Sequence, residues 1–145
     1  MRAGRREGPP KVYFTEPGLV ASLLGIETPA QMGRDPLVGN MFENLVVLEA
    51  LKSRFNAGRR SNLYFFRDSK GFEIDLILDE QRQPLPVEIK STHTYDLNLT
   101  KNLRQFASAI PEALTPHLVY AGSPMGCVQG VNVESYLKMY NIVNP

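Results

Sequence analysis

Cysteine is almost absent from this sequence, which has a single one, Cys127. One cysteine excludes an internal disulfide and any cysteine-rich zinc site, and it fits a reducing, cytoplasmic location. No apolar run approaches the roughly 20 residues that a membrane span needs, so we expect no membrane partner. The formal net charge is only +1. No overall basic field therefore favours nucleic acid, and such a partner would have to be held by a local patch.

The length and composition are those of one ordinary globular domain. The chain has 145 residues, of which 43% are hydrophobic and 21% charged. That length allows one sizeable core but is short for two. Residues 1–10 contain three arginines and two prolines, and we expect them to form a disordered tail or the remnant of a linker. Residues 11–143 are then expected to form a single domain.

The pattern of apolar residues predicts a helix, three strands, a second helix and a further strand, in that order. A first helix over 40–55 contains no glycine or proline, with Asn40 as its N-cap and Gly58 as its stop. The other predicted elements are a strand at 63–67, two strands between 71 and 90 joined by a polar turn at 79–84, a helix at 97–110, a strand at 117–121 and a short strand or helix at 131–140. Residues 28–39 and 122–130 are expected to be loops. This order fits an α/β fold with a mixed sheet covered by helices.

The two strands between 71 and 90 gather acidic residues and a lysine. Side chains alternate along a strand, so Glu73 and Asp75 share one face of the first. Its apolar residues are expected on the opposite face, which would carry Phe72, Ile74, Leu76 and Leu78. Glu88 and Lys90 likewise share one face of the second strand. If the strands pair as a hairpin, two carboxylates and an ammonium meet on one surface, which is costly to bury without metal binding or catalysis as a reason.

These residue types suit a hard divalent cation. Mg²⁺ and Mn²⁺ take oxygen ligands, often one or two carboxylates plus water and substrate phosphates, so Asp75 and Glu88 are the candidate ligands. Lys90, Asp75 and Glu88 are the candidate catalytic residues, and Lys90 would orient or deprotonate a water or stabilise charge on a phosphate. Glu43 joins the ligands if the first helix packs on that face, and Glu73 is a supporting neighbour. The alternatives are a cross-strand salt bridge on a solvated sheet face, and for Glu43 a capping role in its helix.

Asp75 followed by Glu88-Ile89-Lys90 at the end of an apolar strand resembles the signature of the PD-(D/E)xK nuclease superfamily. That resemblance implies a restriction-endonuclease-like fold, an α/β mixed sheet flanked by helices. It also implies Glu43 as the helix glutamate, Asp75 and Glu88 as the metal carboxylates and Lys90 as the catalytic lysine. On the second helix, Lys101 and Gln105 would be the polar residues facing the site.

A more specific resemblance covers about residues 11–143. It rests on the segments KVYFTEPGLVASLLG, GNMFENLVVLEA, GFEIDLIL and PVEIK. These are similar to the C-terminal domain, DUF4143, of a family of bacterial and archaeal AAA-type ATPases, in which the domain follows an ATPase module and a winged helix. This sequence has no G-x-x-x-x-G-K-[ST] loop, so we expect no ATP site in it. The chain therefore looks like an excised or truncated C-terminal domain.

The sequence favours a metal-dependent, nuclease-like domain that hydrolyses phosphodiester bonds of nucleic acid with Mg²⁺ or Mn²⁺. The alternative is a catalytically inactive module that keeps a nuclease-like fold and docks a protein partner or the missing ATPase module. A basic cluster could contact a nucleic-acid backbone, although such clusters are more often solvated helix ends. Its members are Lys52, Arg54, Arg59 and Arg60.

Overall fold

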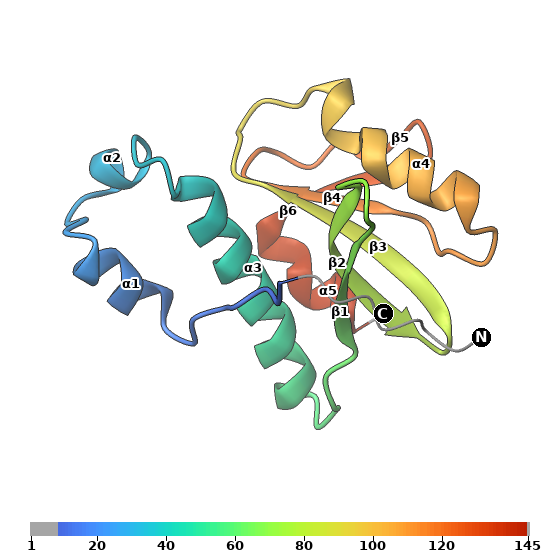
Figure 1. The fold of residues 1–145 in the computed structure, drawn as a ribbon, viewed down its shortest axis with the longest axis horizontal. Helices are drawn as coiled ribbons and strands as arrows, with labels where there is room; N and C mark the ends of the chain where they lie inside the picture. Colours follow the sequence, from blue (N-terminus) through green and yellow to red (C-terminus); the bar gives the residue numbers. More distant parts are fainter. Residues whose placement is uncertain (1–8, 145) are drawn as a thin grey trace.

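The computed structural model describes residues 9–144, so most of the tail predicted over residues 1–10 lies outside the described part. These residues build a six-stranded mixed sheet in the order β1-β2-β3-β4-β6-β5 (Figure 1). The pairs β3–β4 and β4–β6 are parallel and the other pairs antiparallel. The strands are β1 Leu63–Arg67, β2 Glu73–Glu80, β3 Gln83–Lys90, β4 His117–Tyr120, β5 Gly126–Val128 and β6 Val131–Ser135. The prediction of an α/β mixed sheet flanked by helices is confirmed.

Helices cover both faces of this sheet and form two hydrophobic cores. The helices are α1 Pro17–Leu23, α2 Pro29–Met32, α3 Val38–Asn56, α4 Lys101–Ala109 and α5 Met139–Val143, with 3-10 turns at Leu97–Thr100 and Tyr136–Lys138. The first core joins α3 and α5 to one face through residues such as Val46, Ala50, Leu76, Val87 and Met139. The second joins α4 to the other face through residues such as Ile74, Leu103, Phe106, Leu118 and Val133. The carboxyl end of β3 lies between these two layers.

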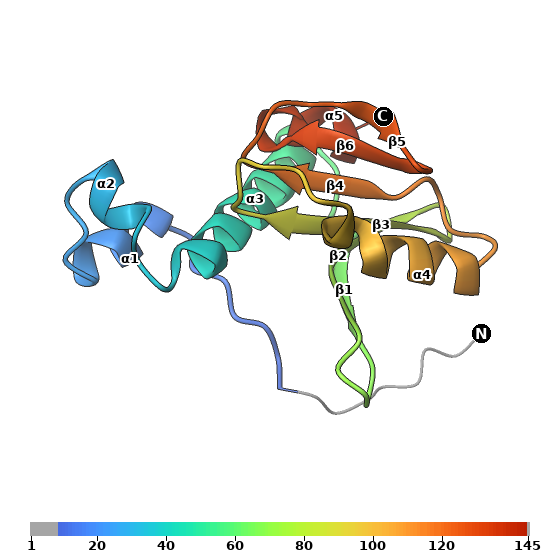
Figure 2. The ribbon, with the colours of Figure 1, turned by 90° about the horizontal axis from the view of Figure 1, so that it is seen from above.

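The helices α1 and α2 form an arm that extends away from the sheet (Figures 1 and 2). Neither helix contains a buried residue. The stretch 28–39, predicted to be a loop, contains α2 because Thr28 and Gln31 form a capping box around its first turn. In the described residues, no helix combines the length and apolarity needed to cross a membrane.

The prediction that Asn40 caps the long helix is wrong. The helix α3 begins two residues earlier, at Val38, and Leu37 occupies the N-cap position without a side-chain hydrogen bond. Because α3 begins at Val38, Glu43 lies in its second turn, and a capping role for Glu43 is excluded. At the other end Gly58, with φ of +68°, follows the C-cap Ala57 and ends the helix as predicted.

Two predicted loops are shorter or more ordered than the sequence suggests. The polar turn expected over 79–84 is only Gln81–Arg82, whose φ values of +54° and +73° are those of a tight hairpin turn. Neither residue is the asparagine or glycine that usually marks such a turn, so the sequence predicts a turn in this segment but not its two central residues. The loop expected over 122–130 contains the edge strand β5, and residues 131–140 hold the strand β6 followed by the start of the C-terminal helical segment.

A β-bulge in β2 changes which core its residues face. Tyr64 pairs with Ile77 and Phe66 with Ile74, so one residue of β1 opposes both Asp75 and Leu76. Ile74 therefore packs in the α4 core and Leu76 in the α3–α5 core. The prediction that the apolar residues of β2 share a single face is wrong for this reason.

Gly122 lets the segment after Lys90 pack closely against the end of β4. A Cβ atom at Gly122 would lie 2.5 Å from the carbonyl oxygen of His93 and would also overlap the Tyr120 ring. We expect Gly122→Ala to destabilise the fold by about 1–3 kcal/mol in urea unfolding. Gly18→Ala is the control, because a Cβ there meets nothing within 4 Å. Equal stability of Gly122→Ala and the wild type would contradict this packing.

Candidate functional site

Asp75 lies where β2 and β3 separate. The β2–β3 ladder ends at the pair Leu76 and Val87, which leaves the backbone N–H of Ile89 without a partner on β2. The Asp75 carboxylate replaces that partner, since Oδ2 accepts from the Ile89 N–H at 2.9 Å and from Lys90 Nζ at 3.0 Å. Burial by itself would raise the pKa of Asp75, but the hydrogen bond from Glu88, the Lys90 charge and the Ile89 N–H outweigh it and lower the pKa.

Glu88 is the more deeply buried acid of the pair. Its side chain is 3% exposed, and its Oε2 lies 2.6 Å from Lys90 Nζ. Its Oε1 is buried and accepts no hydrogen bond. Burial, together with the negative charge of Asp75, raises the pKa of Glu88 to about 8. The two carboxyl groups therefore interact strongly, with the pKa of Asp75 lowered and that of Glu88 raised.

Lys90 connects the two acids. Its ammonium contacts Asp75 at 3.0 Å and Glu88 at 2.6 Å, with the side chain 36% exposed. Burial would lower the pKa of Lys90, but the charges of Asp75 and Glu88 raise it above its usual value. The Lys90 ammonium therefore brings together the three strand residues that the sequence predicted.

A second lysine, Lys11, was not among the site residues predicted from the sequence, and it contacts the remaining acids. Lys11 Nζ contacts Glu43 Oε1 at 2.8 Å, Glu73 Oε1 at 2.6 Å and Asp75 Oδ1 at 3.8 Å. Its side chain is 13% exposed. Burial would lower the pKa of Lys11, but the hydrogen bonds with Glu43 and Glu73 raise it. Glu73 also binds Arg67 at 2.7 Å.

Residues 11–14 form an N-terminal strap that lies across α3 and holds Lys11 in place. The Tyr13 hydroxyl donates to Glu43 Oε1 at 2.7 Å. The backbone N–H of Phe14 donates to Asn44 Oδ1 at 2.7 Å, and Asn44 Nδ2 donates back to the Phe14 carbonyl at 2.9 Å. This segment has no periodic pattern, and its contact with α3 spans about thirty residues of sequence, 32 between Lys11 and Glu43. No periodic pattern therefore predicts its contact with α3.

The polar residues predicted on the second helix lie apart from this contact network. Lys101 and Gln105 are exposed on α4. It is the neighbouring Asn102 that reaches β2, where its amide donates to the Glu73 carbonyl oxygen at 3.2 Å. The sequence therefore predicted the helix. The residue that contacts the sheet is Asn102, one position after the predicted Lys101.

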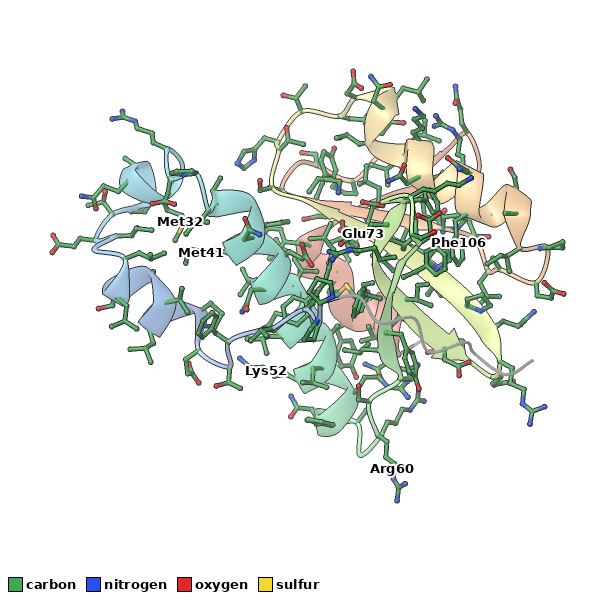
Figure 3. All side chains as sticks on the ribbon, viewed as in Figure 1. Met32, Met41, Lys52, Arg60, Glu73 and Phe106 are labelled. Carbon is green, nitrogen blue, oxygen red and sulfur yellow. The ribbon has the colours of Figure 1, made fainter. Side chains whose placement is uncertain are left out.

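The basic cluster at the end of α3 does not gather beside the acids. Figure 3 shows Lys52 and Arg60 near the far end of α3, away from Glu73. Arg54 is only 11% exposed and is held 3.6 Å from Glu80. The guanidinium of Arg54 also donates to the Val143 carbonyl oxygen. This cluster therefore lies at the end of a helix, with Arg54 held against the fold, and it does not form a wall of the candidate site.

The donor set around Asp75 and Glu88 fits one hard divalent cation. Both groups supply carboxylate oxygens, and Glu88 Oε1 is a buried acceptor with no donor, which a cation would satisfy. Within residues 9–144 no three acidic, histidine or cysteine side chains are already arranged as a metal cage. A cation bound here would thus complete its coordination with water or substrate, as Mg²⁺ commonly does.

Two curated proteins, both longer than this chain, are similar to it. The uncharacterized proteins Mb2031c of Mycobacterium bovis and Rv2008c of Mycobacterium tuberculosis are each 33% identical over 90 residues, 62% of this chain. The chain spans only about a fifth of their length, since the match covers 20% of each. No solved structure matches the chain significantly.

One family also matches, and it covers most of the candidate site. Residues 38–129 match the family described as "Domain of unknown function (DUF4143)". This segment runs from the start of α3 to the end of β5 and its turn, and it includes Glu43, Asp75, Glu88 and Lys90, whereas Lys11 precedes it. The chain belongs to the DUF4143 family.

Proposed function

We propose that this domain is a divalent-metal-dependent phosphodiesterase that acts on nucleic acid, with Asp75 and Glu88 as the metal ligands. The observation that carries the proposal is the buried Glu88 carboxyl, 3% exposed, with Oε1 accepting no hydrogen bond and a second carboxyl beside it. A cross-strand salt bridge on a solvated face requires none of this burial. Paired acids with displaced pKa values are typical of reactive sites.

The residues of the site have separate roles in phosphodiester hydrolysis. A divalent cation, when bound, would polarise a phosphate oxygen and lower the pKa of a bound water. Asp75 and Glu88 hold the metal. Lys90 supplies N–H donors and a positive charge beside the same carboxylates, so it orients the attacking water and stabilises charge that develops on the phosphate. The resemblance to the PD-(D/E)xK superfamily points to the same assignment.

The test is a calorimetric titration of Mn²⁺ into the wild type and Asp75→Asn, with plasmid and oligonucleotide cleavage measured on the same samples. We expect saturable binding in the wild type, a loss of roughly 100-fold or more in affinity in the variant, and loss of cleavage with it. The substitution keeps the shape of the side chain and removes the charge that holds the cation.

Asp79→Asn is the matched control. Asp79 lies on the same strand but is exposed, and its Oδ1 accepts from the Arg82 backbone N–H in the hairpin turn. We expect this variant to bind Mn²⁺ and cleave like the wild type. Absence of Mn²⁺ binding in the wild type would remove the catalytic proposal.

A second candidate function, a catalytically inactive interaction module, is favoured by the α1–α2 arm. Apolar side chains on and beside this arm are exposed, among them Phe14 at 57%, Leu19 at 60% and Leu23 at 78%. Contiguous exposed apolar surface is typical of protein contacts. In such a module, partner binding would depend on these residues and would be unchanged by Asp75→Asn.

A further inference from the structure

A second cavity, of about 610 Å³, opens on the sheet face opposite to Glu88. Val87 and Ile89 pack in the α3–α5 core, so Glu88 between them faces the α4 layer. His117 begins β4 two residues before Val119, which packs in the α3–α5 core, so these two residues share that face. The cavity is therefore separate from the candidate metal site. Its lining includes Leu85, Leu114, His117, Glu134, Lys138 and Ile142.

Two polar atoms of this lining are buried and have no hydrogen-bond partner within residues 9–144. They are His117 Nδ1 and Glu134 Oε2. The Lys138 ammonium lies 3.6 Å from Glu134 Oε2, beyond hydrogen-bond distance, and its side chain is 53% exposed. Buried polar atoms in proteins nearly always have a hydrogen-bond partner. Two unpaired atoms at one cavity therefore point to a bound group that supplies their partners.

The two atoms have opposite hydrogen-bonding roles. Asn132 pairs with His117 across β4 and β6, and its side-chain Nδ2 lies 3.3 Å from His117 Nε2. An amide nitrogen only donates, so Nε2 accepts, and the proton of a neutral imidazole is on Nδ1. Burial lowers the pKa of His117, against the opposing effect of the Glu134 charge, so the ring is neutral at pH 7. The cavity thus presents an N–H donor from His117 and a carboxylate acceptor from Glu134.

We propose that this cavity binds a nucleoside, through an edge of its base that carries a hydrogen-bond acceptor next to an N–H donor. The His117 N–H donates to the acceptor, and the N–H of the base donates to Glu134. In uracil these groups are a carbonyl oxygen and the adjacent ring N–H. The site uses none of the candidate metal ligands, so it does not depend on the proposed function.

The size and charge of the cavity favour an uncharged nucleoside over a nucleotide. Its volume lies within the range of about 300–1,000 Å³ that is typical of small-molecule sites. Leu85 and Ile142 provide apolar surface for a flat ring. The charged side chains of the lining are those of Glu80, Glu134 and Lys138, so acidic groups outnumber basic ones and a phosphate would be repelled.

The ligand would take the place of Lys138 at Glu134. The ammonium makes an ion pair with Glu134 from an exposed side chain, and such pairs contribute little to stability. Lys138 can therefore move away from the carboxylate at little cost. No part of either hydrophobic core has to open for the base to reach the two unpaired atoms.

The experiment titrates uridine into the isotope-labelled wild type and follows the backbone amide signals by NMR, which also detects weak binding. Uridine methylated on its ring N–H is the matched ligand, because it keeps the ring and the carbonyl oxygens but offers Glu134 no donor. We expect saturable shifts in β4, β6 and α5 with uridine, and binding at least about tenfold weaker for the methylated compound. Uridine monophosphate should also bind more weakly than uridine.

Two variants each remove one partner of the base. We expect His117→Phe and Glu134→Ala to weaken uridine binding at least about tenfold. His93→Phe is the matched control, since His93 is the second histidine of the sequence and is exposed after β3. Glu134→Ala remains informative if His117→Phe fails to fold, because the Glu134 side chain is 22% exposed.

Each outcome decides the proposal. Loss of uridine binding in both variants, with His93→Phe unchanged, would establish the site. Absence of uridine binding in the wild type would mean that ordered water alone pairs with the two atoms, and would overturn the proposal. Binding that survives both variants would place the nucleoside elsewhere, with the same consequence. Asp75→Asn should bind uridine like the wild type, so this test and the Mn²⁺ titration can fail separately.

Discussion

Glu88→Gln should make the protein more stable at alkaline pH. The pKa of Glu88 is about 8 in the folded state against an ordinary value of 4.5, so folding takes up a proton between these two pH values. The stabilisation associated with that proton is complete below pH 4.5 and is lost as the pH rises through 8. A neutral glutamine loses nothing over this window. We expect the variant to be more stable than the wild type by on the order of a few kcal/mol at pH 9, and similar to it near pH 5.

Urea unfolding at pH 5 and pH 9 measures this difference. Glu49→Gln is the control for net charge, since the side chain of Glu49 is 51% exposed and pairs with Lys52 at 3.7 Å. Its stability should follow that of the wild type at both pH values. Parallel pH profiles for Glu88→Gln and the wild type would show that Glu88 is ionised throughout. A gain in stability on loss of the acid is the opposite of what a structural salt bridge predicts.

Lys90→Met should have the reverse effect and a larger one. The ammonium of Lys90 contacts both Asp75 and Glu88, so its removal leaves the buried Glu88 without that cation and leaves Asp75 with the Ile89 N–H and the more distant Lys11. Breaking a buried ion pair from one side costs about 3–5 kcal/mol. The loss should be greatest at high pH, where both acids are ionised, and smaller near pH 5, where Glu88 is protonated.

A double-mutant cycle identifies the cause of the stability lost in Lys90→Met. Lys90→Met combined with Glu88→Gln removes the carboxyl group that has lost its cation, and we expect it to recover a large part of the stability lost in Lys90→Met. Lys138→Met is the matched control, because Lys138 is 53% exposed and lies 3.6 Å from Glu134. That variant should lose no more than about 1 kcal/mol. A loss of the same size in Lys90→Met would place Lys90 on an ordinary solvated surface.

The strand residues of the candidate site were accessible from sequence because two local rules determine them. Side chains two apart share a face, which groups Glu88 with Lys90, and the short hairpin turn places Asp75 opposite Glu88. The fold class followed from the order of helices and strands for similar reasons. These rules operate over a few residues or across one turn, where the sequence contains the necessary information.

Contacts between distant segments were not accessible in this way. Lys11 meets Glu43 and Glu73 only because the strap packs against α3, which depends on the side chain of Asn44. The start of α3 was also misplaced, since its N-cap Leu37 makes no capping hydrogen bond and a polar residue three positions later was the stronger signal. Tertiary packing decides both features, and a single sequence does not record it.

The bulge in β2 has a consequence for finding such sites in other sequences. The apolar alternation of β2 shifts phase by one residue at Asp75, with Ile74 facing one core and Leu76 the other. Without the bulge, the β2–β3 ladder would continue. The N–H of Ile89 would then be paired with the backbone of β2 instead of with the Asp75 carboxylate. The sequence itself alternates without a break from Phe72 to Leu78, so the bulge is evident only in the pairing of β1 with β2. A search for such sites should therefore use an aspartate followed by a strand that ends in Glu-x-Lys, and it should not require or exclude regular apolar alternation.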